Sequence, residues 1–479
     1  MKTSLLSPLL VVKTFFLLSM LMLAGCEKPT PESENLVSDK EIELVSPDPI
    51  KILIVGDELL GAPLGRQWKA RRNGTVSTIN QTEAEFAASG LEIPDDVDLV
   101  IYPPKFIGEL AETEKINPIP REVWSSEELD KNELLKHFRM SIARFSDRPW
   151  AVPLGGSTYS MIYNKDMLQS TGFKPPEFWE NTEKRLKKLP TESPKNIPAG
   201  IDMPLAEGWA VQTFLARIAP TIRQRGQLST FFNRDNMTPL VAQPIVVATL
   251  EQLKQISTER SLDLDPQKTF ELAREGKSNI AMTWPQRLDA EKLDSESANL
   301  SIQSLPGVEE WFDYGRNVWN KRNDPDEMHT HLVGFNGLVI SVSTKAPNES
   351  TALEFLQWLP SKNISLLTLN QSAELGPFRA THLGDVSRWT GEVLSIDVLD
   401  EYADVVAECH ERPLVLLFPR ILKQDRYLKF LDNAIREYLA TDDADAKVIL
   451  QKVAEQWEEL TEEIGRDVQV KALRRESGY

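Results

Sequence analysis

The chain from Lys51 onward alternates short apolar runs with stretches of helical character, and this alternation constrains the fold most. Residues 51–55, Lys-Ile-Leu-Ile-Val, form an apolar run that ends at Gly56 and is typical of a buried strand. Residues 62–72 are predicted to be helical, and residues 97–102 form a second apolar run that stops at two prolines. Strands that alternate with helices predict βαβ units and a mainly parallel sheet.

The composition is that of a folded protein and excludes several classes. The 479 residues allow two or three domains at about 150 residues per domain. Hydrophobic residues make up 41% and charged residues 26%, which excludes wholesale disorder and collagen-like repeats. The net charge of −18 leaves no surplus of Lys and Arg for phosphate, so we expect no nucleic-acid partner. Two cysteines are too few for a disulfide framework.

Residues 1–25 have the features of a targeting segment. Lys2 and Lys13 carry its only charges, and the apolar stretch at residues 15–23 is too short to span a bilayer. Residues 23–26, Leu-Ala-Gly-Cys, resemble the bacterial lipobox, in which the cysteine receives a lipid. The resemblance implies that Cys26 anchors the protein to the extracytoplasmic side of a membrane in the bacterial cell envelope. An ordinary signal peptide followed by a chance cysteine is the alternative. Residues 26–49, rich in Pro, Glu and Ser, are predicted to be a flexible tether.

A connector is predicted around Trp150, because two prolines and two glycines bracket a short extended piece at residues 148–156. Residues 159–163 are predicted to form the next strand. Residues 176–189 are predicted to be a helix, since a proline stands at their start and two glutamates lie near the positive end.

Four landmarks occur in an order that resembles a known family, and the first of them is a group of three short motifs. Trp-Ala-Val-Pro-Leu (150–154) is followed by Tyr-Asn-Lys-Asp (163–166) and Gly-Phe-Lys-Pro-Pro-Glu-Phe-Trp (172–179). A Gly-Lys-x-x-x-Ala-Met strand (276–282), a strand, turn and helix (333–359) and a helical region (419–465) complete the order. The chain between about residues 50 and 465 therefore resembles the extracellular solute-binding proteins of bacterial ABC importers, in their sugar-binding branch.

The resemblance implies a fold and a domain organisation. The fold would be α/β, with the two lobes of the type II periplasmic binding proteins, hinge strands and a ligand cleft between the lobes. Lobe one would comprise residues 50–150 and 331–376, and lobe two residues 151–330 and 377–479.

Two acids directly after the first predicted strand are candidate ligand-binding residues. Asp57 and Glu58 follow residues 51–55, and ligands of open α/β sheets bind beyond the carboxyl ends of strands. A carboxylate can accept hydrogen bonds from two neighbouring hydroxyl groups of a sugar. A turn or a helix cap is the structural alternative for both.

Aromatic side chains are the second kind of candidate, because the resemblance implies that sugar rings stack on them. Trp284 follows the predicted strand at residues 280–283, Trp209 lies near the start of a predicted helix, and Tyr159 begins a strand. Trp311 belongs to an aromatic cluster with Tyr314 and Trp319, which would be a pocket wall or a small satellite core. Tyr427 shares a helix face with apolar residues, so it could equally be a core residue.

Other chemistries have weaker sequence signals. His329 and His331 follow three acids and could form a metal site, but metal sites draw three or four supported ligands, so we expect none. Cys409 beside His410 could be a nucleophile or simply a buried small residue. No hydrolase, metalloprotease, phosphate-loop or dinucleotide motif is present, so we expect no enzyme activity and no cofactor. Paired carboxylates for glycoside hydrolysis stay open in so acidic a chain.

The sequence thus predicts a lipid-anchored, monomeric substrate-binding protein of an ABC importer. It would capture a small-molecule carbohydrate and deliver it to the permease subunits. A binding-protein fold used for sensing or scaffolding is the alternative, and a lipoprotein hydrolase is a third reading.

Overall fold

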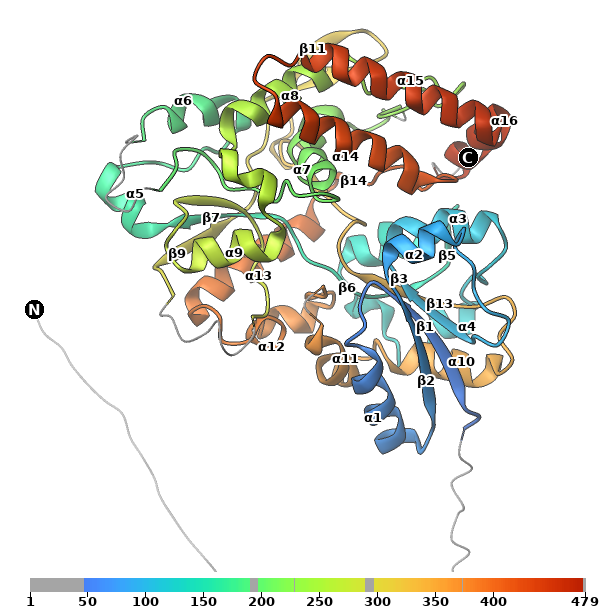
Figure 1. Cartoon of the computed structure of the whole chain (residues 1–479). Helices are drawn as coiled ribbons and strands as arrows, with labels where there is room; N and C mark the ends of the chain where they lie inside the picture. The colour runs from blue at the N-terminus through green and yellow to red at the C-terminus, as the bar shows by residue number, and fades with distance from the viewer. Residues whose placement is uncertain (1–46, 190–196, 228, 289–296, 373, 477–479) are drawn as a thin grey trace, which may run out of the picture. The chain divides into compact units, whose positions relative to one another are not determined.

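The structure is a computed structural model that describes residues 47–189, 197–227, 229–288, 297–372 and 374–476 (Figure 1). The proposed targeting segment, Cys26 and nearly all of the tether lie outside these residues. The chain from Ser46 to Tyr479 forms one compact unit. None of the helices in the described part of the chain combines the length and apolar character needed to cross a membrane.

A five-stranded sheet contains the first apolar run. Its order is β2 (Val76–Gln81), β1 (Ile50–Val55), β3 (Leu99–Tyr102), β13 (Leu338–Val342) and β6 (Val152–Gly155). β1 pairs in parallel with β2 and β3, and β13 is antiparallel to β3 and β6. Pro153 is tolerated in β6 because this strand is at the edge of the sheet. The amino end of β13 therefore lies at the same edge as the carboxyl ends of β1, β2 and β3.

Helices pack on this sheet through aromatic side chains. Trp68 of α1 (Gly61–Arg72) contacts Phe355 and Trp358 of α10 (Glu349–Trp358), with ring centroids 5.0 and 4.8 Å away. All three side chains are buried. α2 (Glu83–Ala88) follows β2, and α3 (Ile107–Glu112) follows β3 after a short 3₁₀ turn.

A second sheet has three strands, in the order β8 (Ile280–Thr283), β7 (Ser160–Asn164) and β9 (Leu300–Gln303). β7 is antiparallel to both neighbours, so the expectation of a mainly parallel sheet is wrong for this part. Long connections separate these strands along the chain. A long connection can return the chain to either end of a sheet, so it does not fix whether the next strand is parallel or antiparallel. α9 (Pro266–Arg274) and α13 (Ile396–Glu411) flank the sheet (Figure 1).

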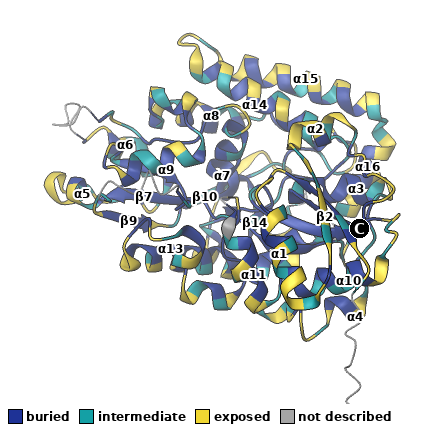
Figure 2. Ribbon diagram, turned by 60° about the horizontal axis from the view of Figure 1, so that its bottom comes forward, coloured by how far each residue is buried: buried dark blue, intermediate teal, exposed yellow. Residues whose placement is uncertain are grey.

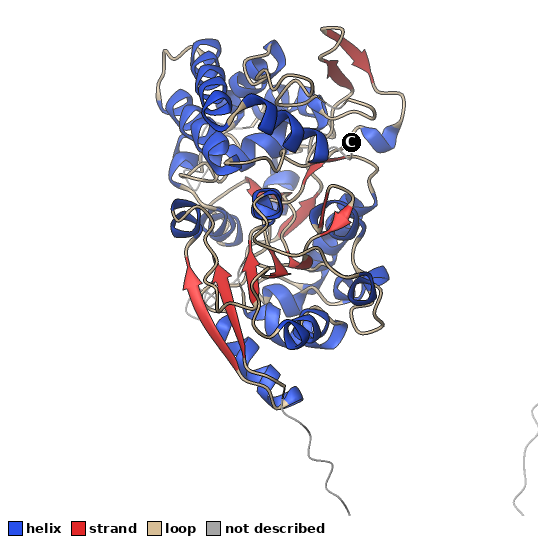
Figure 3. Cartoon of the chain, turned by 90° about the vertical axis from the view of Figure 1, so that its right-hand side faces the viewer, coloured by secondary structure: helices blue, strands red, loops and turns tan. Residues whose placement is uncertain are grey.

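A group of helices occupies the upper part of Figure 1. It contains α7 (Ala210–Ile222), α8 (Pro244–Ile256), α14 (Gln424–Ala440), α15 (Ala446–Ile464) and α16 (Arg466–Glu476). Figure 2 shows α15 with buried residues (dark blue) on one side and exposed residues (yellow) on the other, as expected of an amphipathic helix. In Figure 3 the helices (blue) at the top lie apart from the long strands (red) of the first sheet.

The remaining elements are short. The helices are α4 (Arg121–Trp124), α5 (Lys165–Thr171), α6 (Thr182–Leu186), α11 (Lys362–Thr368) and α12 (Ser387–Thr390). The small strand pairs are β4 (Arg144–Phe145) with β5 (Arg148–Pro149), β10 (Glu310–Asp313) with β11 (Val318–Lys321), and β12 (His331–Leu332) with β14 (Val415–Leu416). The helix predicted at residues 176–189 is shorter than expected, because only α6 and a preceding 3₁₀ turn are helical there.

The chain leaves the first sheet a few residues after Trp150, where the prolines and glycines of residues 148–156 predict the connector. β6 still pairs with β13, so the passage to β7 lies at residues 156–159 rather than near Trp150. Glycines make this passage narrow. A Cβ atom on Gly155 would lie 2.6 Å from the carbonyl oxygen of Gly376, and one on Gly156 would lie 2.5 Å from that of Asn336. Three segments far apart in the sequence therefore meet backbone to backbone.

Candidate functional site

A cavity of about 750 Å³ lies at the carboxyl ends of β1 and β2. Such a volume is within the range of small-molecule sites. One side comes from segments that follow these strands, and the opposite side comes from the start of α7. The polar and aromatic lining of the cavity includes Asp57, Glu58, Glu83, Glu85, Lys105, Trp209, Gln212, Asn336 and Glu374.

Asp57 is the buried acid of this cavity. Gly56 takes a φ of 93°, which lets the chain turn sharply at the end of β1. The Asp57 side chain is 8% exposed, and its Oδ1 accepts a 3.0 Å hydrogen bond from the backbone N–H of Leu59. Its buried Oδ2 has no hydrogen-bond partner among the described residues. Burial raises the pKa of this carboxyl, although the Ser372 hydroxyl and backbone N–H groups favour the ionised form.

Glu374 is the second acid whose protonation the cavity controls. Its side chain is exposed to the solvent of the cavity, yet the surrounding protein raises its pKa to about 7. Desolvation is the main cause, and the negative charges of Glu83, Asp57 and Asp265 add to it. The carboxylates of the two sides of the cavity therefore influence one another.

Two further acids are occupied by local contacts. Glu83 forms an ion pair with Lys105. Glu85 accepts hydrogen bonds from the backbone N–H and the hydroxyl of Thr82, which completes a capping box at the start of α2. These bonds hold the pKa of Glu85 below its usual value. Lys105 is thus engaged, and no described ion pair neutralises Asp57, Glu58 or Glu374.

An aromatic cluster forms the opposite wall. Trp209 directly precedes α7, is half-buried and lines the cavity. Trp284 follows β8, is 3% exposed and lies behind Trp209, with ring centroids 6.1 Å apart. Tyr159 packs edge-on against Trp284 at 4.9 Å, and its hydroxyl lies 3.4 Å from that of Thr213. Of these three aromatic residues only Trp209 lines the cavity.

α14 fixes the position of Trp209 from the far side. The carboxylate of Asp432 accepts hydrogen bonds from the backbone N–H groups of Gly208 and Val211, both at 2.9 Å. These donors stand at the amino end of α7, where backbone N–H groups lack partners within the helix. Burial raises the pKa of Asp432, and the two hydrogen bonds oppose that rise.

The structure separates two other predicted residues from this cavity. Trp311 of β10 lines a different pocket, with Tyr314 and with residues 225–235. Tyr427 is fully buried, and its hydroxyl lies 2.9 Å from that of Thr461 in a core that includes Trp457. The amphipathic pattern around Tyr427 therefore reflects helix packing. Neither Trp311 nor Tyr427 lines the candidate site.

Cys409 and the neighbouring His410 occupy buried positions elsewhere. Burial raises the pKa of the Cys409 thiol and so disfavours the thiolate. The Nδ1 atom of His410 accepts a hydrogen bond of 3.3 Å from the backbone N–H of His137. No group of three or more His, Cys, Asp or Glu side chains is arranged for a metal ion within the described ranges.

Sequence reasoning missed several lining residues, among them Glu83, Lys105, Asn336 and Glu374. Lys105 follows β3 and Glu83 follows β2, so the rule that selected Asp57 could have found both. β2 was not recognised because its sequence, Val-Ser-Thr-Ile-Asn-Gln, is largely polar. Glu374 has no such signal, since it stands in a segment without regular structure.

Comparisons with known proteins agree with this architecture. The family model described as bacterial extracellular solute-binding protein matches residues 70–382. The chain belongs to this family. No curated protein is similar enough in sequence to match it.

Solved structures share the fold of this solute-binding protein at low sequence identity. An ABC transporter solute-binding protein of Agrobacterium radiobacter in complex with ribitol has 18% identity and a TM-score of 0.65, over 86% of this chain and 98% of that one. The maltose-bound MalE3 of T. maritima has 15% identity and a TM-score of 0.61, over 86% and 100%. A solute-binding protein of Agrobacterium vitis with bound D-mannitol has 14% identity and a TM-score of 0.60, over 87% and 99%. These matches confirm the predicted α/β fold of two-lobed solute-binding proteins.

Proposed function

We propose that the protein is the lipid-anchored substrate-binding component of an ABC importer for a sugar or a polyol. The observation that carries the proposal is the cavity that Asp57 and Trp209 line together. A carboxylate that accepts hydrogen bonds from hydroxyl groups and an indole that packs on C–H groups are the two contacts such a ligand needs. Ligands named with similar folds, ribitol, maltose and D-mannitol, support this class.

Lobe one of the proposed arrangement holds the first sheet, and lobe two holds the second sheet with the helices of the C-terminal region. Lobe one would comprise residues 50–150 and 331–376, and lobe two residues 151–330 and 377–479. β6 is the exception, because it pairs with β13 in the first sheet and therefore belongs to lobe one. The glycine contacts at residues 155, 156, 337 and 376 would then be the hinge.

Ligand binding would shift the population towards a closed form, because only that form brings both walls of the cavity against the ligand. The closed form would dock on the permease subunits, and the protein would perform no chemistry on the ligand. Cys26 would carry the lipid that keeps the protein at the extracytoplasmic face of a membrane.

The proposal is tested with the soluble form, residues 27–479. Thermal-shift measurements with a panel of sugars and polyols should identify a ligand, and calorimetric titration should give its affinity. Asp57→Asn should weaken binding by about 1.5–3 kcal/mol, the range of a hydrogen bond to a charged group. Trp311→Ala is the matched control, since Trp311 lines a different pocket.

A panel in which no sugar or polyol binds, while the protein is folded, would refute the proposed ligand class. Equal losses in Asp57→Asn and Trp311→Ala would refute the proposed site but not the ligand class.

A further inference from the structure

The cavity gathers more carboxyl groups than a neutral ligand requires. Asp57, Glu58 and Glu374 line it, and none of the three has an ion-pair partner among the described residues. Lys105 is the single cationic side chain among the described lining residues, and it is paired with Glu83. A neutral sugar gains hydrogen bonds from carboxylates, but it does not neutralise them.

Asp57 shows this imbalance most clearly. More than nine-tenths of the residue is buried, and its Oδ2 accepts no hydrogen bond in the described part of the chain, although the nearby Ser372 hydroxyl favours the ionised carboxylate. A buried acceptor without a donor costs free energy, and the cost grows when the group is charged. A positive charge on a ligand in the adjoining cavity would offset this cost.

The aromatic wall suits the same kind of ligand. The face of an indole attracts cations through its quadrupole, and Trp209 stands half-buried at the cavity with Trp284 behind it. Carboxylates and an indole around one cavity are the elements with which proteins bind an ammonium group. A metal ion fits less well, because no cluster of three potential ligands is arranged for one among the residues described.

We propose that the cavity binds a sugar or polyol that carries a positively charged amino group. This inference rests on the proposed function and narrows its ligand class. The ammonium group would neutralise the charge of Asp57 and Glu374, and the hydroxyl groups would use the remaining polar lining.

The test compares ligands in matched pairs on the soluble form. The pairs are glucosamine with glucose, galactosamine with galactose, mannosamine with mannose, glucamine with sorbitol, and the disaccharide chitobiose with cellobiose. Calorimetric titration at pH 7 and low salt should show at least one amino compound binding about ten- to a hundredfold more tightly than its neutral partner. The advantage should shrink at high salt only in part, because the cavity is screened less than the surface.

Variants locate the effect within the cavity. Glu374→Gln and Asp57→Asn should each reduce the advantage of the amino compound about tenfold, while Glu374→Gln leaves a neutral partner's affinity nearly unchanged. Glu122→Gln is the matched control, since Glu122 is an exposed acid of α4 outside the cavity. Glucamine is an alkylamine and is protonated near pH 7, so its titration in two buffers of different ionisation enthalpy should also reveal proton release on binding, which Glu374→Gln should reduce.

The outcomes separate this inference from the proposed function. Neutral compounds that bind as tightly as their amino partners, or more tightly, overturn the inference and leave the proposed function standing. An amino advantage that survives both cavity variants also overturns it. If no compound of either kind binds, both proposals fail.

Discussion

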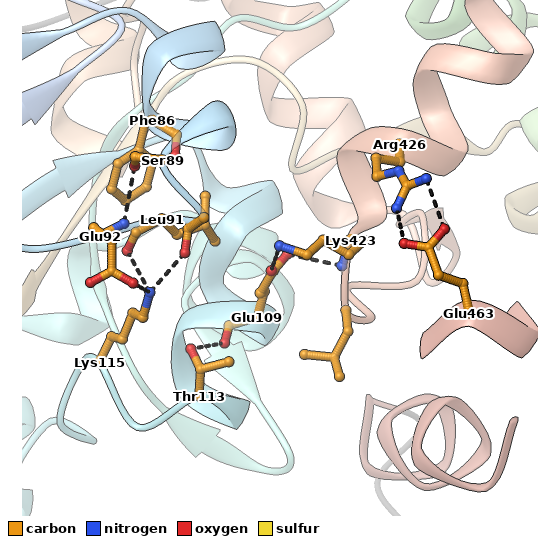
Figure 4. Close-up of polar contacts among 12 residues, drawn as sticks. Phe86, Ser89, Leu91, Glu92, Glu109, Thr113, Lys115, Lys423, Arg426 and Glu463 are labelled. Carbon is orange, nitrogen blue, oxygen red and sulfur yellow. Dashed lines mark hydrogen bonds and ion pairs between the residues drawn. The ribbon is translucent and has the colours of Figure 1, made fainter. Parts of the chain in front are cut away.

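The carboxylate of Glu109 in α3 contacts both nitrogen atoms of Lys423, which directly precedes α14 (Figure 4). It accepts a 2.9 Å hydrogen bond from the backbone N–H of Lys423 and forms a 3.1 Å ion pair with its Nζ. Glu109 is 6% exposed, and Gly108 beside it packs so closely that a Cβ would lie 1.8 Å from the carbonyl oxygen of Arg420. This contact joins the helix after β3 to the C-terminal helices.

The two halves of this contact should differ in importance. Glu109→Ala should lower the free energy of unfolding by about 1–3 kcal/mol, because the backbone N–H of Lys423 would be left without a buried acceptor. Lys423→Ala keeps that hydrogen bond and removes only a partly exposed ion pair, so it should cost about 0–1 kcal/mol. Urea unfolding of both variants measures the difference. Equal losses would show that the ion pair, and not the backbone hydrogen bond, stabilises the contact.

The crossing glycines should tolerate no side chain. Gly337 has a φ of 91°, and a Cβ there would lie 1.9 Å from the carbonyl oxygen of Gly155. Gly337→Ala should therefore lower the free energy of unfolding by at least about 2 kcal/mol, because the two backbones must move apart to make room for the methyl group. Urea unfolding measures this loss. Gly90→Ala is the control, because Gly90 also has a positive φ of 74° but has open space around it. It should cost only about 1 kcal/mol of backbone strain. Similar losses in both variants would mean that the crossing is not tightly packed.

The sequence predicts part of this architecture because some of its signals are local. The apolar run at residues 51–55 becomes β1, and the position of Asp57 at a carboxyl end places it at the cavity. The direction of β7 could not be predicted, because long connections set it. Glu374 reaches the cavity only through the return of the chain past Gly155 and Gly156, which no periodicity encodes.

Aromatic residues illustrate a second limit of the sequence. Trp209 and Tyr427 each belong to or border a helix, yet one lines the cavity and the other is fully buried. An apolar pattern on a helix shows which face is buried. It does not show whether that face packs on other helices or borders a ligand cavity. The motif order, in contrast, predicts the family, because it samples several elements at once.

Two buried histidines should make stability depend on pH. Desolvation lowers the pKa of His331 and His382 to about 3. The positive charges of Arg412 near His331 and of Arg379 near His382 add to this shift, and the negative charge of Glu408 opposes it at His331. A histidine with a lowered pKa binds fewer protons in the folded state than in the unfolded state. Stability from these groups is therefore complete above about pH 6.5 and is lost as the pH falls below that value.

The measurement compares the wild-type protein with His382→Gln at each pH, so that contributions of the carboxyl groups cancel. The wild type should lose up to about 2 kcal/mol more than the variant between pH 7.5 and pH 5. Glutamine can still hydrogen-bond to the Ser365 hydroxyl, which lies 3.2 Å from Nε2 of His382. Parallel stability curves for the two proteins would contradict the prediction.

Membrane association should depend on Cys26. The Leu-Ala-Gly-Cys ending of the apolar N-terminal stretch supports lipidation of this thiol. Cys26→Ser should abolish labelling by a radioactive or clickable fatty acid, and the protein should be released or stay unprocessed. Cys409→Ser is the control for labelling, because Cys409 is buried and lies far from this segment in the sequence. Unchanged labelling in Cys26→Ser would refute the anchor.

Trp209, which lines the cavity, and Trp284, which lies behind it, should respond differently to truncation. Trp209→Ala should weaken ligand binding by about 1–3 kcal/mol, the range for burial of one large apolar side chain, and should change stability less because Trp209 is half-buried. Trp284 is 3% exposed and supports Trp209 from behind, so Trp284→Ala should lower stability by about 3–5 kcal/mol. It should also weaken binding, because Trp209 would lose its support. Calorimetric titration and urea unfolding of both variants separate the two roles.

Trp209→Phe retains an aromatic face and should recover part of the affinity. If Trp284→Ala weakens binding while Trp209→Ala does not, the ligand contacts Trp284 itself and the cavity opens more deeply than the structure indicates.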